Sequence, residues 1–349
     1  MKRIKNFSAD GKAEFILTFS RFFCILIYNE NKRCARHAFI YDWNDNMDFH
    51  DFKTVKNEYR PSAVWYLCGA PTAEEIDSEL KRFAKKGIGR IYLKPTGQLS
   101  VRYMSRDYFE LVRTAARRSA HYGIELWLYD DNGKSSGFCG GEITSVPEYR
   151  AAGLAAVSAA DVRKSDNVIC ENGAGSIIAE KKDGRADICS EEAADCFAEH
   201  FYGALRGECQ RFLGIEISGM VSNPRIDEYL PYSREVYEKF SESSGKAAVC
   251  LFREDTDGRN CRRKYLSEIT AAAKNGFIEK GAAECKKSGL RFSLLPGGRL
   301  LENQSVYMMS ELPCIEFDCT APDFTAVKRL TSCGEIFGIR TAVSIKTQR

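Results

Sequence analysis

The stretch GIELWLYDDNGKSSGFCGG, residues 123–141, joins a short apolar run to a polar loop in a pattern that favours a parallel α/β fold. Residues 124–129 are rich in strand formers, and Asp130 and Asp131 follow them directly. The glycines of the loop let backbone approach a ligand closely, because they carry no Cβ. A buried strand that ends in paired acids and a Gly/Ser loop is typical of the active-site edge of a parallel sheet. The same acids could instead cap backbone N–H groups in a turn, and residue type leaves both interpretations open.

Strand and helix patterns alternate on both sides of this stretch. Apolar runs at 63–68 and 88–93 precede it, and each is followed by a helical repeat of apolar residues that ends at a glycine. Further strands are expected at 215–221, 290–295, 314–317 and 339–344. Such alternation implies parallel strands joined by right-handed crossovers.

Seven strands alternating with helices predict a (β/α)8-type TIM barrel that lacks its last β/α unit. An open doubly wound sheet is the competing architecture, but no G-x-G-x-x-G turn follows the first strand. Residues 154–190 break the rhythm with short alternating pieces, which predict a small β-hairpin insertion after strand three. We therefore divide the chain into an N-terminal extension, residues 1–50, and a barrel, residues 51–349.

The composition is that of a globular protein with a sizeable core: 44% of the 349 residues are hydrophobic, and the mean hydropathy is −0.35. The 51 basic and 48 acidic residues nearly balance, which argues against a nucleic-acid or membrane-surface partner. The apolar run at 15–28 is too short to span a bilayer. The 14 cysteines contain no C-x-x-C pair, which favours free thiols and a cytoplasmic location. The sequence leaves the oligomeric state open.

Several short motifs follow one another from residue 52 onward. They are EYRP at 58–61 with Trp65, LWLYDD at 126–131, SGFCGG at 136–141, PEYR at 147–150 and LPYS at 230–233. In this order they resemble the α-L-rhamnosidase-like glycosidases, glycoside hydrolase family 106 and its relatives. The resemblance implies a barrel with a sugar site at the carboxyl ends of its strands, and terminal deoxyhexose glycosides as substrates. It also implies calcium, which often sits in the site of that family.

The chain departs from this family where a glycosidase needs its two carboxyl groups. At the end of strand four the family has Asp-Glu-Pro, whereas this chain has Ser222 and Asn223 before the proline. The Gly-His after strand five is replaced by Leu-Pro at 295–296, and the glutamate of strand seven by Ile345. A hydroxyl or an amide cannot donate a proton as a carboxylic acid does at neutral pH. Whether the protein is an enzyme is therefore uncertain.

Three interpretations stay open. The protein is a pseudoenzyme of carbohydrate metabolism that binds glycans or is structural, which the sequence favours. Alternatively, it is an active glycoside hydrolase that uses displaced loop carboxylates, for which Asp227, Glu228 and Asp318 are the candidates. These acids could equally be solvated loop charges. Finally, the chain could be one piece of a longer polypeptide, because family members continue into further modules.

The candidate sugar contacts follow the first, third and fourth strands. Trp65 could stack on a sugar ring, although aromatic residues in barrel strands are more often core. The polar candidates are Asp130, Asp131, Ser136, Gly137 and Asn223. No metal ligands are expected, because calcium wants many oxygen ligands and no such set is visible. Calcium therefore rests on the family resemblance alone, and no other cofactor is expected.

Overall fold

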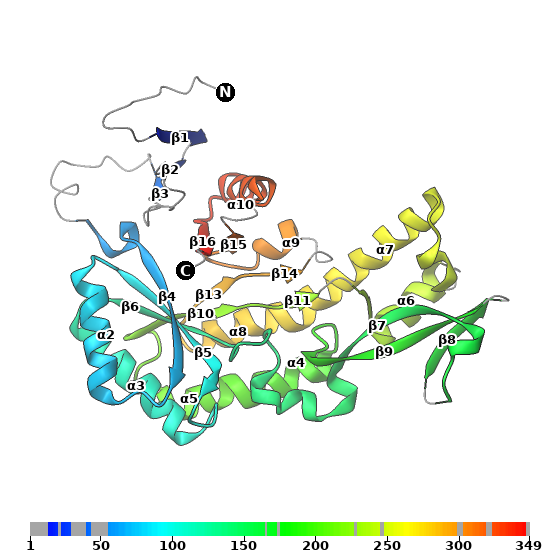
Figure 1. The fold of residues 1–349 in the computed structure, drawn as a ribbon, viewed down its shortest axis with the longest axis horizontal. Coiled ribbons are helices and arrows are strands. Elements are labelled where there is room, and N and C mark those ends of the chain that lie inside the picture. Colours follow the sequence, from blue (N-terminus) through cyan, green and yellow to red (C-terminus); the bar gives the residue numbers. More distant parts are fainter. Residues whose placement is uncertain are drawn as a thin grey trace.

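A five-stranded parallel sheet with the order β13-β10-β6-β5-β4 forms the centre of the molecule (Figure 1). The computed structural model describes residues 13–19, 22–28, 40–42, 55–164, 166–172, 175–226, 229–244, 248–298, 303–318 and 323–346. The strands of this sheet are β4 (Ser62–Gly69), β5 (Arg90–Leu99), β6 (Glu125–Tyr129), β10 (Ile217–Ser222) and β13 (Arg291–Leu294). The predicted parallel sheet is thus confirmed.

Helices connect the strands and pack their apolar sides on the sheet. They are α2 (Ala73–Lys85), α3 (Arg106–His121), α4 (Glu191–Phe197), α5 (Ala204–Cys209), α8 (Glu279–Lys287) and α9 (Asn303–Tyr307), whereas α10 (Phe324–Phe337) packs in a separate cluster with Ile315. The sequence signals explain their ends. At the start of α2, the Thr72 hydroxyl accepts the Glu75 N–H at 3.2 Å and the Glu75 carboxylate accepts the Thr72 N–H at 2.8 Å. This is the capping box that the sequence predicts.

The two faces of the central sheet carry different cores, because side chains alternate along a strand. The outer face is the one that packs on the helices, with Leu93, Leu128 and Met220 in its large core. The inner face carries a smaller cluster. It consists of Trp127, Tyr129, Val221 and Leu295, with Val64, Tyr92, Leu312 and Cys314 packed against them.

Trp127 fills the inner face near the amino ends of the strands. Its ring is fully buried and lies between two guanidinium groups, with Arg90 5.3 Å and Arg291 4.9 Å from its centroid. Both arginines pair with the Glu125 carboxylate, which also accepts the Trp127 indole N–H at 3.0 Å. Gly219 makes room for this ring, since a Cβ there would lie 2.5 Å from it. Charge and packing at this end indicate a stabilising role.

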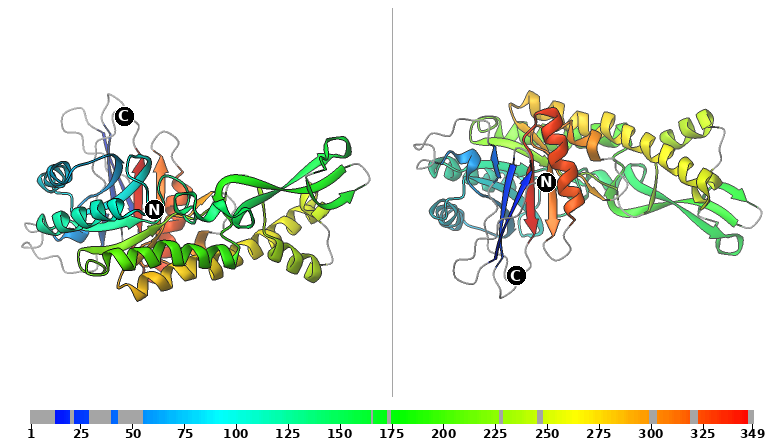
Figure 2. Two further views of the ribbon diagram at one scale, coloured as in Figure 1. Left: turned by 90° about the horizontal axis from the view of Figure 1, so that it is seen from below. Right: turned by 90° about the horizontal axis from the view of Figure 1, so that it is seen from above.

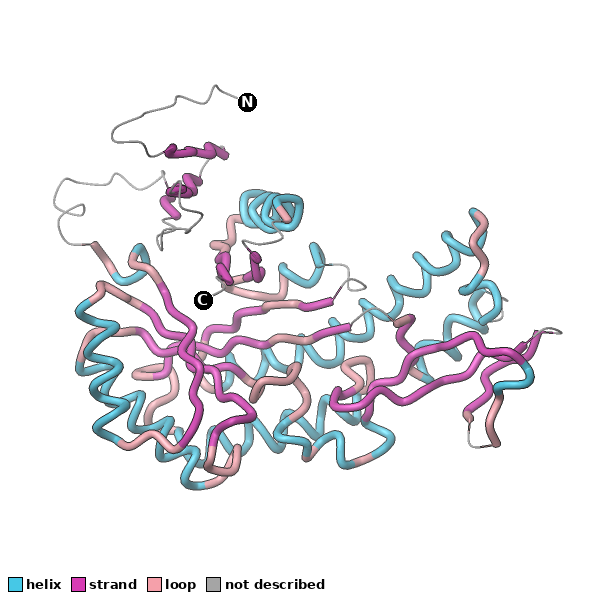
Figure 3. Tube along the Cα trace, viewed as in Figure 1, coloured by secondary structure: helices cyan, strands magenta, loops and turns pink. Residues whose placement is uncertain are grey.

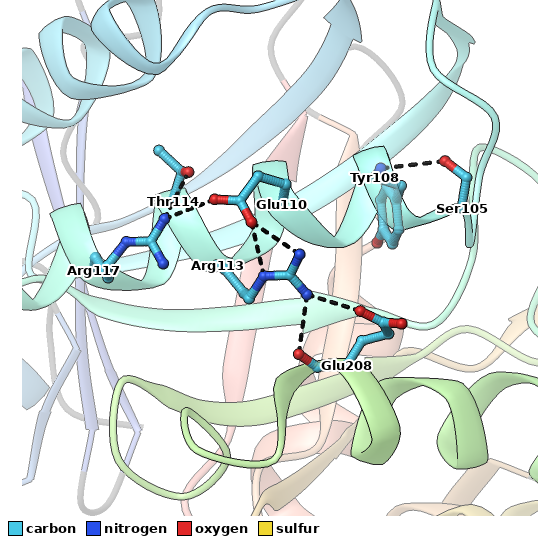
Figure 4. A network of polar contacts seen from close by, with 7 residues as sticks. All are labelled: Ser105, Tyr108, Glu110, Arg113, Thr114, Arg117 and Glu208. Atoms are coloured by element: carbon cyan, nitrogen blue, oxygen red, sulfur yellow. Dashed lines mark hydrogen bonds and ion pairs between the residues drawn. The ribbon is translucent and has the colours of Figure 1, made fainter.

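An ion-pair network ties α3 to α5 on the outer side (Figure 4). The Arg113 guanidinium donates to the Glu208 carboxylate and to the Glu208 carbonyl, at 2.9 and 3.1 Å. It also donates to Glu110, which accepts from Arg117 as well. Hydrogen bonds from Arg113, the largest cause, and from Arg117 lower the pKa of Glu110.

An arm projects from the central sheet, as Figures 1 and 2 show. Its antiparallel sheet has the order β12-β7-β9-β8. The strands are β7 (Arg150–Ser158), β8 (Asn167–Asn172), β9 (Gly175–Ala186) and β12 (Leu230–Tyr232). Helices α6 (Arg234–Ser244) and α7 (Thr256–Ala273) pack against this sheet, with the hydroxyl of Tyr265 donating to the Pro231 carbonyl at 2.9 Å. Antiparallel strands thus occupy the range where the sequence predicts a hairpin.

Closure of the sheet into a barrel is not confirmed. The strands β15 (Cys314–Asp318) and β16 (Ala342–Lys346) form a separate parallel pair, and within the described residues β15 shares no ladder with β13. A hydrogen bond connects β13 to the segment just before β15: the Ser293 hydroxyl donates to the Leu312 carbonyl at 2.6 Å. The tube view shows both strand groups on the same side of the helices α4, α5 and α8 (Figure 3).

The remaining strands form small sheets of their own. They are β1 (Ala13–Phe19), β2 (Phe22–Tyr28) and β3 (Ile40–Asp42), which pair antiparallel, and β11 (Arg225–Ile226) and β14 (Gly297–Gly298), which pair parallel. The apolar run at 15–28 therefore belongs to an antiparallel hairpin. In the part of the chain that the structure describes, no helix has the length and apolar character required to cross a bilayer.

Candidate functional site

The candidate site lies at the carboxyl ends of β5, β6 and β10, where Asp130 and Asp131 follow the buried strand β6. Both aspartates are 0% exposed. Because neighbouring residues of an extended chain point to opposite sides, the two carboxylates reach different faces of the sheet. The structure places them in two distinct environments, which the sequence does not distinguish.

Asp131 belongs to the inner face. Its Oδ2 lies 3.4 Å from the Lys94 ammonium, and its Oδ1 accepts the Gly133 N–H at 2.9 Å. Burial raises the pKa of Asp131, while the charge of Lys94 opposes that shift. Lys94 also sits over the ring of Tyr129, 4.3 Å from its centroid.

Asp130 belongs to the outer face, where burial, with a smaller contribution from the Asp130 charge, raises the pKa values of Tyr202 and Cys285. Its Oδ1 accepts the Ser136 hydroxyl, and that hydroxyl oxygen accepts the Asn223 backbone N–H at 2.5 Å. Burial raises the pKa of Asp130 to about 7, and hydrogen bonds from Ser136 and Ser222 oppose the shift. Asp130 therefore bonds the loop to the end of β10.

The loop of small residues is packed into the protein. Ser136 is 0% exposed and Gly137 is buried, with a φ of +93° that favours glycine. A Cβ at Gly137 would lie 2.9 Å from that of Ala186 and 3.2 Å from the Phe277 ring. Both residues thus have a supporting position under the site, and direct contact with a sugar stays a prediction for them.

Trp65 and the aspartates are not brought together. The half-buried Trp65 ring packs with the outer-face core and meets Phe83 of α2 edge-on, with centroids 6.1 Å apart. Its neighbour Tyr66 is 57% exposed and follows the inner-face residue Val64 by two positions. The alternation of side chains along β4 is the sequence signal that could have singled out Tyr66.

The carboxyl end of β10 agrees with the sequence prediction. The strand ends at Ser222, and Asn223 follows it. Ile345 lies in β16, and Asp318 is the last residue of β15. Asp227 and Glu228 lie outside the described residues. Over the ranges that the structure describes, no three His, Cys, Asp or Glu side chains gather as a metal site would require.

Comparison with known proteins identifies the type of fold and no family. No protein-family model and no curated protein matches the chain. The chain is similar to the structure of a rhamnosidase from Novosphingobium sp. PP1Y, with a TM-score of 0.56 and 8% identity, over 82% of this chain and 51% of that one. A β-galactosidase from the psychrophilic Marinomonas ef1 gives a TM-score of 0.46 and 10% identity, over 73% of this chain and 40% of that one.

The protein therefore has a glycosidase-like fold. The chain spans about half the length of the rhamnosidase, 51% of it. An identity of 8% supports the fold and does not define a family, so membership of family 106 stays a prediction.

Proposed function

We propose that the protein is a glycoside-hydrolase-like, rhamnosidase-related member of carbohydrate metabolism that binds a glycan and is catalytically impaired. The observation that carries this proposal is the state of the carboxylates at the carboxyl edge of the central sheet. Asp130 and Asp131 are both 0% exposed and both engaged by protein groups. In barrel enzymes this edge holds the reacting groups.

Hydrolysis of a glycoside by the usual route needs an acid at the leaving oxygen and a second carboxylate at the sugar. The end of β10 offers a hydroxyl and an amide, Ser222 and Asn223, where the usual route needs a carboxyl group. Burial raises the pKa of Asp131, and the Lys94 ammonium that it faces opposes that rise. This arrangement supports binding without turnover.

The reducing interior of the cell is the compartment that we propose. The described residues include eleven free cysteines, of which Cys139, Cys209 and Cys285 are examples of buried thiols. Free thiols in such number suit a reducing environment.

Two measurements test the proposal. We expect no turnover of aryl α-L-rhamnosides above the rate in buffer, and a binding isotherm with rhamnose or rhamnose-containing oligosaccharides in titration calorimetry. Turnover that disappears in Glu228→Gln or Asp318→Asn would overturn the impaired assignment and establish the active hydrolase with displaced carboxylates. The matched control is Glu238→Gln, an exposed glutamate on α6.

A further inference from the structure

Four polar or aromatic residues continue the inner face of the sheet beyond its apolar cluster. Each lies two positions after a member of that cluster, so that its side chain points to the same side. The pairs are Val64 and Tyr66, Tyr92 and Lys94, Tyr129 and Asp131, and Val221 and Asn223. The sheet register places Tyr66 directly beside Lys94 on the neighbouring strand.

The contacts confirm that these side chains share one side. Lys94 lies over the Tyr129 ring and 3.4 Å from Asp131. Tyr66 is the register partner of Lys94 on the neighbouring strand, so its ring continues the same side. The row therefore runs from an exposed ring, through a lysine that is 17% exposed, to a buried carboxylate and an amide.

From this row we infer that Tyr66 and Lys94 form the sugar-contacting surface of the protein, with Tyr66 as the stacking ring in place of Trp65. A tyrosine that is 57% exposed offers a flat apolar face. Lys94 supplies donors, and the Asp131 carboxylate 3.4 Å away holds it in place. This inference deepens the proposed glycan binding and rests on it.

The paired charges of Lys94 and Asp131 indicate the class of sugar that would bind. Asp131 offsets the charge of Lys94 within 3.4 Å, so the row presents hydrogen-bonding groups without net charge. Such a surface fits a neutral pyranose, which offers its C–H face to the Tyr66 ring and an adjacent hydroxyl to the Lys94 ammonium. An acidic sugar would find its attraction to Lys94 reduced by the buried Asp131 carboxylate.

Titration calorimetry on the full chain tests this, with methyl α-L-rhamnopyranoside, methyl α-D-mannopyranoside and D-glucuronate as probes. We expect the wild type to bind at least one neutral glycoside more tightly than glucuronate. Tyr66→Ala should weaken that binding about tenfold, because the stacking contact is lost. Tyr66→Phe keeps the ring and should stay within about twofold of the wild type.

Phe337→Ala is the matched control, because it removes another exposed ring, 44% exposed, from α10. Unchanged affinity in Tyr66→Ala would overturn the role of Tyr66 and leave the proposed glycan binding standing. Tighter binding of glucuronate would overturn the neutral class. If the wild type binds none of the probes, the proposed glycan binding fails together with the inference. Far-UV circular dichroism of each variant establishes that it is folded.

Discussion

At the scale of the residue, Asp130 and Asp131 show how one position along a chain changes the chemistry of a side chain. Asp131 meets the Lys94 ammonium and a backbone N–H on the inner face, whereas Asp130 meets the Ser136 hydroxyl on the outer face. The first environment compensates a negative charge and the second largely does not. Two identical residue types therefore lead to different expectations for pH and for mutation.

Asp130 should make stability fall as the pH rises. Its folded pKa of about 7 exceeds its unfolded value near 4, so the folded protein holds an extra proton between those pH values. Stability from this group is complete below the unfolded pKa and is lost as the pH rises through the folded pKa. In Asp130→Asn this part of the pH dependence should vanish, as urea unfolding at pH 5 and pH 8 would measure. An equal change in the free energy of unfolding between the two pH values in the wild type and the variant would contradict this prediction. Asp107→Asn, which changes an exposed aspartate, is the control.

Lys94 should stabilise the fold mainly by compensating Asp131. Lys94→Met leaves a carboxylate that is 0% exposed without its cation, at a cost of roughly 3 kcal/mol. The double variant Lys94→Met/Asp131→Asn removes both charges and should recover most of that loss. Urea titrations of the wild type, Lys94→Met and the double variant give the free energies of unfolding that test this prediction. A double variant as unstable as the single one would show that the charge of Asp131 is not the cause.

At the scale of the element, β10 fits against β6 because Gly219 leaves space for the Trp127 ring. Gly219→Ala would place a Cβ 2.5 Å from ring atoms that are held by Arg90 and Arg291. Overpacking of this kind costs about 1–3 kcal/mol. Gly207→Ala in α5 is the matched control, since a Cβ there meets nothing within 4 Å and alanine favours a helix. Thermal unfolding should therefore separate the two variants, and equal melting temperatures would refute the role of Gly219.

The ion pairs that Glu110 makes along α3 should depend on pH and salt. Glu110 has a lowered pKa, so its contribution is present above its unfolded pKa and is lost as the pH falls through the folded value. Its side chain is 56% exposed, so solvent screening keeps the effect of Arg113→Met below about 1 kcal/mol. Unfolding at low and high salt should show a smaller difference between wild type and variant at high salt. If the difference in unfolding free energy between wild type and Arg113→Met is the same at low and high salt, lost packing and not lost charge is its cause.

At the scale of the whole molecule, the parallel sheet and the arm explain which predictions held. Periodicity and caps are local signals, so the strands of the central sheet and helix α2 could be predicted from residues such as Thr72 and Glu75. Closure of a barrel depends on ladders between distant strands, and the described β13 and β15 do not form one. Local patterns carry no information about such ladders, which is why closure could not be predicted.

The candidate site was predictable in part for the same reason. The sequence identified Asp130, Asp131 and Asn223 as strand-end polar residues, and the structure gathers them. It named Trp65 by residue type and did not consider Tyr66. The side of the sheet on which Tyr66 lies is evident from the inner-face cluster, which contains Val64 two positions earlier.

The sequence by itself determined the order of strands and helices along the chain and their caps, because each of these depends on neighbours in the chain. Only the tertiary structure decided which aspartate meets Lys94 and which meets Ser136. These partners come from separate strands and loops, and parallel register alone brings them within reach of one another.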